Sequence, residues 1–337
     1  MKRAPIRTAI APPTHTSPCA LDNLSLFEEP QEFDRTGLHS RLAALASESV
    51  YIGTSSWKYE GWIGQIYSRD RYLVRGRFSE KRFQAECLNE YAETFPIVCG
   101  DFSFYQFPSE SYWRRLFGSA PASLQYAFKV PEEVTVKAFP THPRYGPRAG
   151  EKNESFLNAA LFQNAFLDLL EPYRTRIAAL IFEFGAFSRQ SYRDAGEFLR
   201  ELDPFLASLP AGFRYAVEIR NPHFLGHDYF ACLRRHGVAH VLNAWTRMPA
   251  LGVQMRLPEA HTANFAVARA LLRQGRPYEQ AVAMFSPYKQ IQDPNPEARR
   301  ALRELIARAR ERHEPSYIFV NNRLEGNAPQ TIEAIVD

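Results

Sequence analysis

Eight short apolar segments of strand-forming composition recur along the chain, and helical periodicity lies between most of them. Alternating strands and helices build a parallel sheet, because a parallel neighbour needs a long crossover connection. Eight repeats in about 290 residues fit a closed (β/α)8 barrel, whose sites lie at the C-terminal ends of its strands. A doubly wound open sheet is the alternative, but no GxGxxG follows the first strand. The expected strands span residues 51–55, 97–102, 125–130, 179–184, 215–220, 238–243, 264–269 and 317–322.

Helical patterns precede most of these strands, as the barrel requires. A short helix at 38–49 is expected before the first strand. The others are expected within residues 79–95, 109–117, 153–173, 192–209, 228–237 and 296–313.

The first 36 residues differ in composition from the rest of the chain. Residues 1–36 are rich in Pro, Ser, Thr and acidic residues, which predicts a flexible or loosely attached extension. Residues 37–337 are then expected to form one barrel domain.

The bulk composition narrows the class of protein. A 45% hydrophobic content supports a sizeable core, and a formal charge of +4 permits an anionic ligand without requiring one. The four cysteines are scattered without a CxxC, which favours reduced thiols and a cytoplasmic protein. No segment approaches the ~20 apolar residues of a membrane span, and the N-terminal residues lack the apolar stretch of a secretion signal.

Polar side chains recur near the C-terminal ends of the expected strands. In "YAVEIRNPHF", Glu218 and Arg220 share one face of a strand, because strand side chains alternate. Burying charge is costly unless it is paired, so a ring of such positions predicts a ligand site at the barrel mouth. The ring comprises Ser55, Asp101, Lys129, Glu183, Glu218, Arg220, Asn243, Arg269, Asn321 and Asn322.

Several motifs, in order, resemble those of the DUF72 (YecE-like) family of TIM-barrel proteins. They are "YIGTSSWKYEGWIGQIYS", "DFSFYQFPSESYWRRL", "YAFKVPEEVT", "YAVEIRNPHF" and "YIFVNNRLEGNAP", and they span about Tyr51 to Ile335. The resemblance implies a barrel fold but no defined activity. The family has been compared with barrel endonucleases and isomerases, but a likeness of fold is an analogy and gives no mechanism.

The motifs match the family residue by residue, with departures. The family's "GTSGW" resembles Gly53–Trp57, "NSTFY" resembles Asp101–Tyr105 and "EFR" resembles Glu218–Arg220. In three places this chain has Cys99 where the family has Glu, Asp101 where it has Asn, and Asn243 where an acid is expected. Thr135-Val136 stands in place of the family's Thr-His, although His142 of a longer loop could supply the histidine. Residues Glu183–Ala186 replace the family's Gln-Leu-Pro-Pro.

The candidate catalytic residues are the ionisable ones of the ring. Glu218 is expected to transfer protons beside Arg220, which would bind a carboxylate or phosphate; an internal salt bridge that only orders the barrel is the alternative. Lys129 could contact phosphate, transfer a proton or form a Schiff base, or simply pair with Glu183 or Glu218. Asp101 and Glu183 could form a two-carboxylate arrangement. Expected substrate-binding residues are Arg220, Arg269, Asn321, Asn322, Trp57, Tyr105, His142 and Asn243.

Three other features admit a functional and a plainer interpretation. Trp57, Tyr59, Trp62 and Tyr67 could stack on a sugar or base, but a loop that plugs the barrel is favoured. The histidine pairs 223/227 and 236/240 have i, i+4 spacing without a matching acid, so no cofactor is expected and a divalent metal stays a lesser alternative. The basic helix at 299–313 could meet nucleic acid, but a solvated outer face is favoured.

The sequence therefore predicts a TIM-barrel enzyme acting on a small anionic, phosphorylated or sugar-like substrate at the barrel mouth. Arg220 and Arg269 would hold the anion, Glu218 or Glu183 would transfer protons, and Lys129 would stabilise developing negative charge. A nucleic-acid-binding or repair-associated protein and a non-catalytic metabolite-binding barrel are the alternatives.

Overall fold

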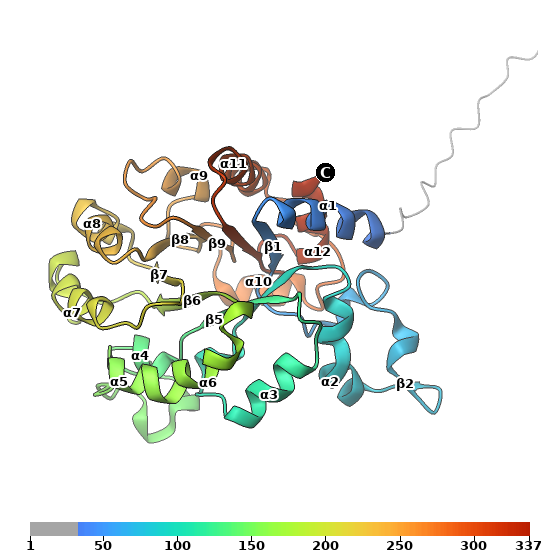
Figure 1. Ribbon diagram of the computed structural model, residues 1–337, viewed down its shortest axis with the longest axis horizontal. Helices are drawn as coiled ribbons and strands as arrows, with labels where there is room; N and C mark the ends of the chain where they lie inside the picture. Colours follow the sequence, from blue (N-terminus) through green and yellow to red (C-terminus); the bar gives the residue numbers. More distant parts are fainter. Residues whose placement is uncertain (1–32) are drawn as a thin grey trace, which may run out of the picture. The chain divides into compact units, whose positions relative to one another are not determined.

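The computed structural model describes residues 33–337, and these form one compact unit built on a closed barrel. Eight parallel strands close in the order β1-β10-β9-β8-β7-β6-β5-β4, and helices surround them (Figure 1). The predicted (β/α)8 barrel is confirmed, with all eight strands close to their expected positions. They are β1 (Val50–Thr54), β4 (Ile97–Gly100), β5 (Gln125–Lys129), β6 (Ile177–Phe184), β7 (Tyr215–Ile219), β8 (Ala239–Ala244), β9 (Ala266–Ala270) and β10 (Ser316–Val320).

Alternation along each strand separates two cores. Residues such as Ala127, Ile181 and Val241 point into the barrel, while their neighbours Phe128, Phe182 and Leu242 pack against the outer helices. The interior set also includes Ile97, Cys99, Ala179, Ala216, Ala239, Val267 and Phe319. Side chains keep alternating toward the C-terminal end of each strand. The next residue that points into the barrel therefore lies at the C-terminal mouth.

The outer helices begin at polar caps and cover the barrel. Ser79, Ser109, Asp194 and Asn295 each accept a hydrogen bond from a first-turn amide, which satisfies one of the free N–H groups. The longer helices are α1 (Arg35–Ser47), α2 (Glu80–Tyr91), α3 (Glu110–Gly118), α7 (Ala195–Ala207), α8 (His227–Arg235), α10 (Tyr278–Phe285), α11 (Pro296–Arg312) and α12 (Ala328–Val336). Single turns are α4 (Glu132–Thr135), α5 (Ala159–Phe162), α6 (Asp168–Leu170) and α9 (Leu251–Gln254).

The prediction of one continuous helix at 153–173 is wrong, because the helix begins later and its hydrogen-bonding pattern changes along its length. Asn153 instead donates to the backbone oxygens of Glu133 and Val136, and Leu157 has a positive φ of 53°, so this part is loop. The helix begins after the N-cap Asn158 and contains a π turn before it ends in a 3-10 turn. Side-chain hydrogen bonding to distant backbone thus overrides the local periodicity.

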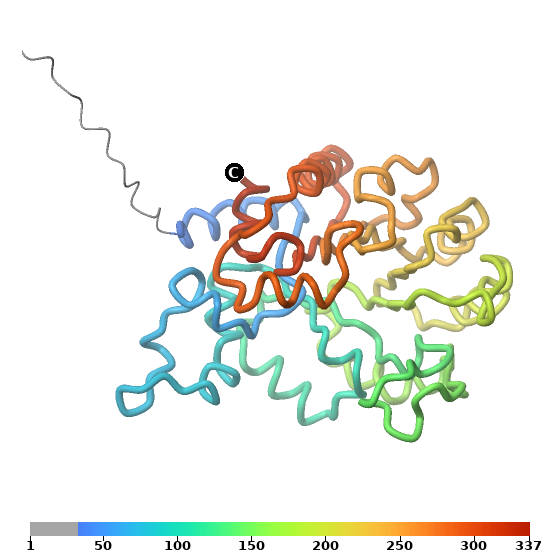
Figure 2. Tube along the Cα trace, turned by 180° about the vertical axis from the view of Figure 1, so that it is seen from behind, coloured from blue at the N-terminus to red at the C-terminus, as the bar shows by residue number. Residues whose placement is uncertain are grey.

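Loops after β1, β9 and β10 meet over the barrel. The loop after β1 contains the 3-10 helices Glu60–Trp62 and Arg69–Tyr72 and a small hairpin, β2 (Leu73–Val74) with β3 (Arg77–Phe78). The β9–α11 connection carries α10 and the segment 286–292, which we call the strap. In Figure 2 this orange connection lies in front of the strands, between the blue β1 loop and the red C-terminal segment.

The predicted N-terminal extension lies almost entirely outside the described residues, except that α1 already begins at Arg35. Cys19 lies outside them too, whereas Cys87, Cys99 and Cys232 are buried free thiols. In the stretch 33–337, no helix has the length and apolar character needed to cross a bilayer.

Candidate functional site

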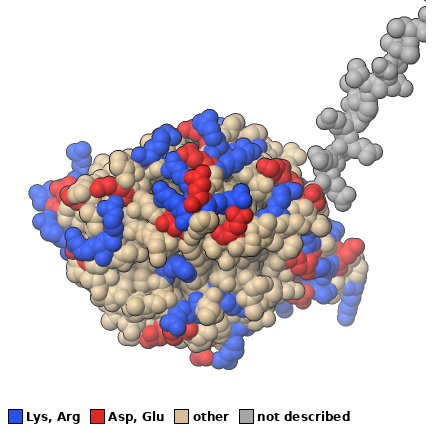
Figure 3. Space-filling view, turned by 45° about the horizontal axis from the view of Figure 1, so that its top comes forward, with Lys and Arg blue, Asp and Glu red and all other residues tan. Residues whose placement is uncertain are grey.

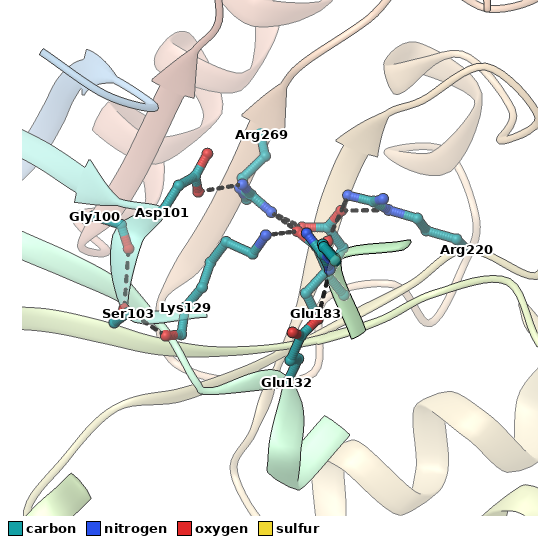
Figure 4. A network of polar contacts seen from close by, with 10 residues as sticks. Gly100, Asp101, Ser103, Lys129, Glu132, Glu183, Arg220 and Arg269 are labelled. Atoms are coloured by element: carbon teal, nitrogen blue, oxygen red, sulfur yellow. Dashed lines mark hydrogen bonds and ion pairs between the residues drawn. The ribbon is translucent and has the colours of Figure 1, made fainter. Parts of the chain in front are cut away.

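Six ionisable side chains gather at the C-terminal mouth of the barrel (Figure 4). Five barrel strands or their ends supply them, namely β4, β5, β6, β7 and β9. We call these residues the charged cluster; they are Asp101, Lys129, Glu183, Glu218, Arg220 and Arg269. The mouth position predicted for them from strand periodicity is therefore where they lie.

Arg269 is the centre of the charged cluster. Its Nη1 lies 2.6 Å from Glu183 Oε2 and also pairs with Glu218 Oε2, while its Nη2 lies 3.1 Å from Asp101 Oδ1. The whole residue is only 1% exposed. The strand register sets up these contacts, because β6 and β7 pair Glu183 directly with Glu218.

Lys129 and Arg220 approach the two glutamates from the other sides. Lys129 Nζ lies 2.9 Å from Glu183 Oε2, and Arg220 Nη2 lies 2.9 Å from Glu183 Oε1. Arg220 also contacts Glu218 Oε1 at 3.2 Å through Nε and Nη2, so its Nη1 makes no ion pair within residues 33–337. Figure 4 shows Lys129 and Arg220 meeting Glu183 from different strands.

Aromatic rings hold both of these cations in place. Lys129 Nζ lies 3.7 Å from the centre of the Phe104 ring, and the Arg220 guanidinium lies 3.8 Å from the centre of the Trp245 ring. Such cation–π contacts orient a charge while leaving some of its N–H groups free. Ser103 Oγ adds support, since it lies 2.7 Å from the backbone oxygen of Lys129.

The electrostatics of the cluster keep its charges ionised. Burial alone would raise the pKa of Glu183, but the charges of Arg220, Lys129 and Arg269 lower it well below its ordinary value. Burial likewise opposes the charge of Arg269, yet Glu218 and the neighbouring acids raise its pKa well above the ordinary value. The cluster groups three basic with three acidic side chains, and the pKa shifts of Glu183 and Arg269 favour their ionised forms.

Several buried polar atoms at the mouth lack partners among the described residues. They include Ser55 Oγ, Asn243 Oδ1, Arg269 Nε, Asn322 Nδ2 and Arg323 Nε. An unsatisfied buried polar group costs about 1–3 kcal/mol, and such groups in native folds call for an explanation. Their concentration near the C-terminal strand ends is typical of a site that receives a polar ligand.

The three asparagines of the predicted site brace the loops around the mouth. Asn243 Nδ2 donates to the backbone oxygen of Ile219, and Asn321 Oδ1 accepts from the amide of Arg323. Asn322 Oδ1 accepts from Trp62 Nε1 at 3.1 Å and from the backbone at residue 328. Turn chemistry accounts for much of their role, and direct ligand contact by them stays a prediction.

Three other predicted substrate-binding residues do not contact the cluster. Trp57 is 4% exposed and lines a surface crevice between α2 and α3, which fits the interpretation of its loop as a plug. His142 accepts a backbone hydrogen bond from Arg144, and Tyr105 is 57% exposed with the Arg144 guanidinium 4.7 Å from its ring. Their roles in ligand binding stay predictions.

Loop residues that face the mouth were not predicted from the sequence. Trp245 follows β8, Phe104 follows β4 and Arg323 follows β10. Tyr59 of the β1 loop, which the sequence already offered as a stacking residue, packs against the rings of Trp62 and Tyr288. These residues lie outside the strands, so alternation along a strand carries no signal for them.

Three of the four histidines in the i, i+4 pairs have separate partners. His227 pairs with Glu259, His236 with Asp203, and His240 Nδ1 lies 3.2 Å from a tyrosine hydroxyl. Asp203, Cys232 and His236 do converge, but at the C-terminal ends of α7 and α8, away from the mouth.

Asp203 of that convergence also pairs with an arginine outside it. Arg235 Nη1 lies 2.8 Å from Asp203, and burial raises the pKa of the Cys232 thiol to about 12. The arrangement is therefore accounted for as an ion-pair network, and a divalent metal there stays a prediction.

A parallel eight-stranded barrel with a buried charged cluster at its C-terminal mouth defines the class of TIM-barrel proteins with a mouth site. Within that class, the chain belongs to the DUF72 family, whose model, described as a protein of unknown function, matches residues 51–337. The resemblance found in the sequence motifs is thereby confirmed.

Known relatives agree with this assignment. The UPF0759 protein YecE of Escherichia coli K12 is 25% identical over 178 residues, and the same protein of the O157:H7 strain matches equally. The match covers 52% of this chain and 50% of the relative, so the chain spans about half the length of the curated relatives it matches.

Solved structures of two DUF72 proteins share the fold. The Thermotoga maritima protein matches with a TM-score of 0.54 at 20% identity, covering 84% of this chain and 96% of that one. An Enterococcus faecalis protein matches with a TM-score of 0.55 at 14% identity, covering 85% and 94%. At these identities the likeness shows the fold alone.

Proposed function

We propose that this barrel binds a small anionic, phosphorylated or sugar-like compound at its C-terminal mouth and acts on it by acid–base chemistry. The charged cluster is the observation that supports the proposal most. Replacing buried ion pairs by apolar residues is often neutral or stabilising, so six charges at a mouth are hard to explain by stability alone. The family context gives the fold, and the chemistry of the site gives the function class.

The geometry suggests a division of roles within the cluster. Arg269 already contacts three carboxylates and is nearly inaccessible, so in this proposal it positions the acids. Arg220 Nη1 and the remaining N–H groups of Lys129 would contact the ligand. Glu183 stays ionised and would act by its charge, because a carboxyl group with a lowered pKa is a poor general acid.

Asp101 is the best-placed group for proton transfer. Its side chain is 30% exposed, whereas Glu218 is fully buried beneath it. A carboxylate that both touches solvent and contacts Arg269 can reach a bound ligand without leaving the network. Asp101 would therefore transfer the proton, and Glu218 would hold Arg220 and Arg269 in position.

A thermal-shift screen against sugar phosphates, carboxylates and nucleotides tests the proposal. A ligand at 100 times its Kd stabilises a protein by about 2.7 kcal/mol, which is readily seen as a higher Tm. We expect stabilisation of the wild type and of an Arg300→Gln control, but not of Arg220→Gln or Lys129→Met. Circular dichroism without ligand checks that each variant is folded.

Turnover is then followed by NMR of the compound that binds. Asp101→Asn should retain binding and lose turnover, because the amide cannot exchange the proton. Binding without turnover by the wild type would instead favour the metabolite-binding alternative. Absence of any stabilising compound, or equal stabilisation of all variants, would contradict the mouth site.

The surface gives less support to a nucleic-acid-binding function. On α11, Arg299, Arg308 and Arg310 pair with Glu325, Glu304 and Glu48. Figure 3 turns the α11 side of the molecule forward and shows Lys and Arg interleaved with Asp and Glu. Steeply salt-dependent binding of oligonucleotides that Arg220→Gln leaves unchanged would favour this alternative over the mouth site.

A further inference from the structure

Arg323 is a cation at the mouth without a counter-charge among the described residues. It lies in the loop after β10, and it makes no ion pair with any residue between 33 and 337. Its Nε is buried without a hydrogen-bond partner, and its guanidinium lies 4.6 Å from the centre of the Tyr278 ring. Every cation of the charged cluster, by contrast, contacts at least one carboxylate.

Three tyrosine side chains come from the loops on this side of the mouth, and the ring of Tyr278 contacts the guanidinium. Tyr59 comes from the β1 loop, Tyr278 begins α10 and Tyr288 lies in the strap. The rings of Tyr59 and Tyr288 meet edge to face, with their centres 5.4 Å apart. The tyrosines belong to the loops after β1 and β9 and Arg323 to the loop after β10, and these three strands are neighbours in the barrel.

The tyrosine hydroxyls near Arg323 are hydrogen-bond donors at neutral pH. Burial raises the pKa of Tyr59 to about 12, and burial also raises the pKa of Tyr288. The positive charge of Arg323 lowers both pKa values in part. A guanidinium beside protonated phenols is a donor set that matches an oxyanion.

The strap holds this donor set in place through contacts on both sides. Gln65 Nε2 donates to the backbone oxygen of residue 289 at 2.6 Å, and Asn327 Nδ2 donates to that of Tyr288 at 2.8 Å. A Cβ on Gly61 would lie 2.0 Å from the Pro287 backbone oxygen, so the strap packs directly on this glycine. Rigid loops of this kind favour a preorganised binding site.

We infer that Arg323, with the hydroxyls of Tyr59 and Tyr288, forms a subsite for the phosphate group of a phosphate monoester. The inference rests on the proposed function and names its substrate class: the phosphate lies at Arg323 and the reacting end lies at the charged cluster. The two lie at the same end of the barrel, because Arg323 follows β10 and Arg269 of the charged cluster lies on β9, the neighbouring strand. An anion placed within the cluster would face three carboxylates, whereas Arg323 offers an uncompensated positive charge. Barrel folds frequently bind phosphate with the loops after their last two strands, which here are β9 and β10.

Titration with inorganic phosphate, by calorimetry or 31P NMR, tests the subsite on the full chain. We expect Arg323→Gln to raise the phosphate Kd at least about tenfold, since it removes a charged hydrogen-bond donor. Tyr59→Phe should raise it less, and the exposed control Arg300→Gln should leave it unchanged. Arg323→Lys should restore part of the affinity. Equal phosphate affinity in wild type and Arg323→Gln, or no phosphate binding by the wild type, would overturn the inference.

A second variant separates this inference from the proposed function. Lys129→Met should keep phosphate binding while it loses the response to the compound found in the screen. If phosphate requires Arg323 but no compound requires the charged cluster, the subsite stands and the proposed function fails. If a compound requires the cluster and tolerates Arg323→Gln, the proposed function stands and the phosphate inference fails.

Discussion

Replacing Arg269 by methionine removes the positive charge at the centre of the cluster while keeping a long apolar side chain. Glu218 is fully buried and would lose the only partner of its Oε2 among residues 33–337, although Arg220 would still contact Oε1 at 3.2 Å. Glu183 would keep Lys129 and Arg220, each at 2.9 Å. The cluster would therefore contain one more carboxylate than cations. Most of this uncompensated negative charge would lie on Glu218.

The expected cost is about 3–5 kcal/mol of unfolding free energy, the range for breaking a buried ion pair by removing one partner. The lost contact to Asp101 adds little, because that side chain is 30% exposed and solvent screens it. Urea unfolding of wild type and variant gives the difference from the shift in midpoint multiplied by the m-value. Arg300→Met, on the exposed side of α11, should stay within about 0.5 kcal/mol of the wild type.

The double variant Arg269→Met with Glu218→Gln checks the cause. Neutralising the stranded carboxylate should recover part of the loss, so the two substitutions should be strongly non-additive. A cost below about 1 kcal/mol for Arg269→Met, or simple additivity in the double variant, would refute the buried-charge reasoning.

Three further perturbations have outcomes that the structure predicts. The fold lowers the pKa of Glu183, so its ionised form stabilises the protein fully above the unfolded pKa, and this stabilisation is lost as the pH falls below about 4.5. The free energy of unfolding of Glu183→Gln, measured over the same acid range, should lack this pH-dependent loss. Burial lowers the pKa of His240 to about 4, so an NMR titration should show the imidazole neutral at pH 5. The free energy of unfolding should fall as the pH drops from about 6.5 toward about 4, because only the unfolded state binds the proton in this range. Gly61→Ala should displace the strap from its contact at Pro287 and speed hydrogen exchange there, whereas Gly185→Ala, with open space around its Cβ position, should not.

The C-terminal ends of the strands could be placed from the sequence only to within about two residues, and the turns after them could not be predicted. Asp101 and Arg220 were expected inside strands, yet β4 ends at Gly100 and β7 ends at Ile219. Both side chains still reach the mouth, because each residue comes immediately after the last residue of its strand. Phe104, Trp245 and Arg323 lie in such turns, where no periodic pattern marks which way a side chain points.

Local sequence patterns were sufficient to predict the barrel and the inward face of each strand. Strand alternation has a period of two, so Lys129, Glu183 and Glu218 could be assigned to one face from neighbouring residues alone. Their partners, in contrast, depend on the closed barrel: Arg269 and Glu183 are 86 positions apart and meet because closure sets their register. The missing counter-charge of Arg323 among residues 33–337 is likewise a tertiary property, since its pairing depends on loops that arrive from three different strands. Alternation sets where a side chain points, and long-range closure sets which groups it meets.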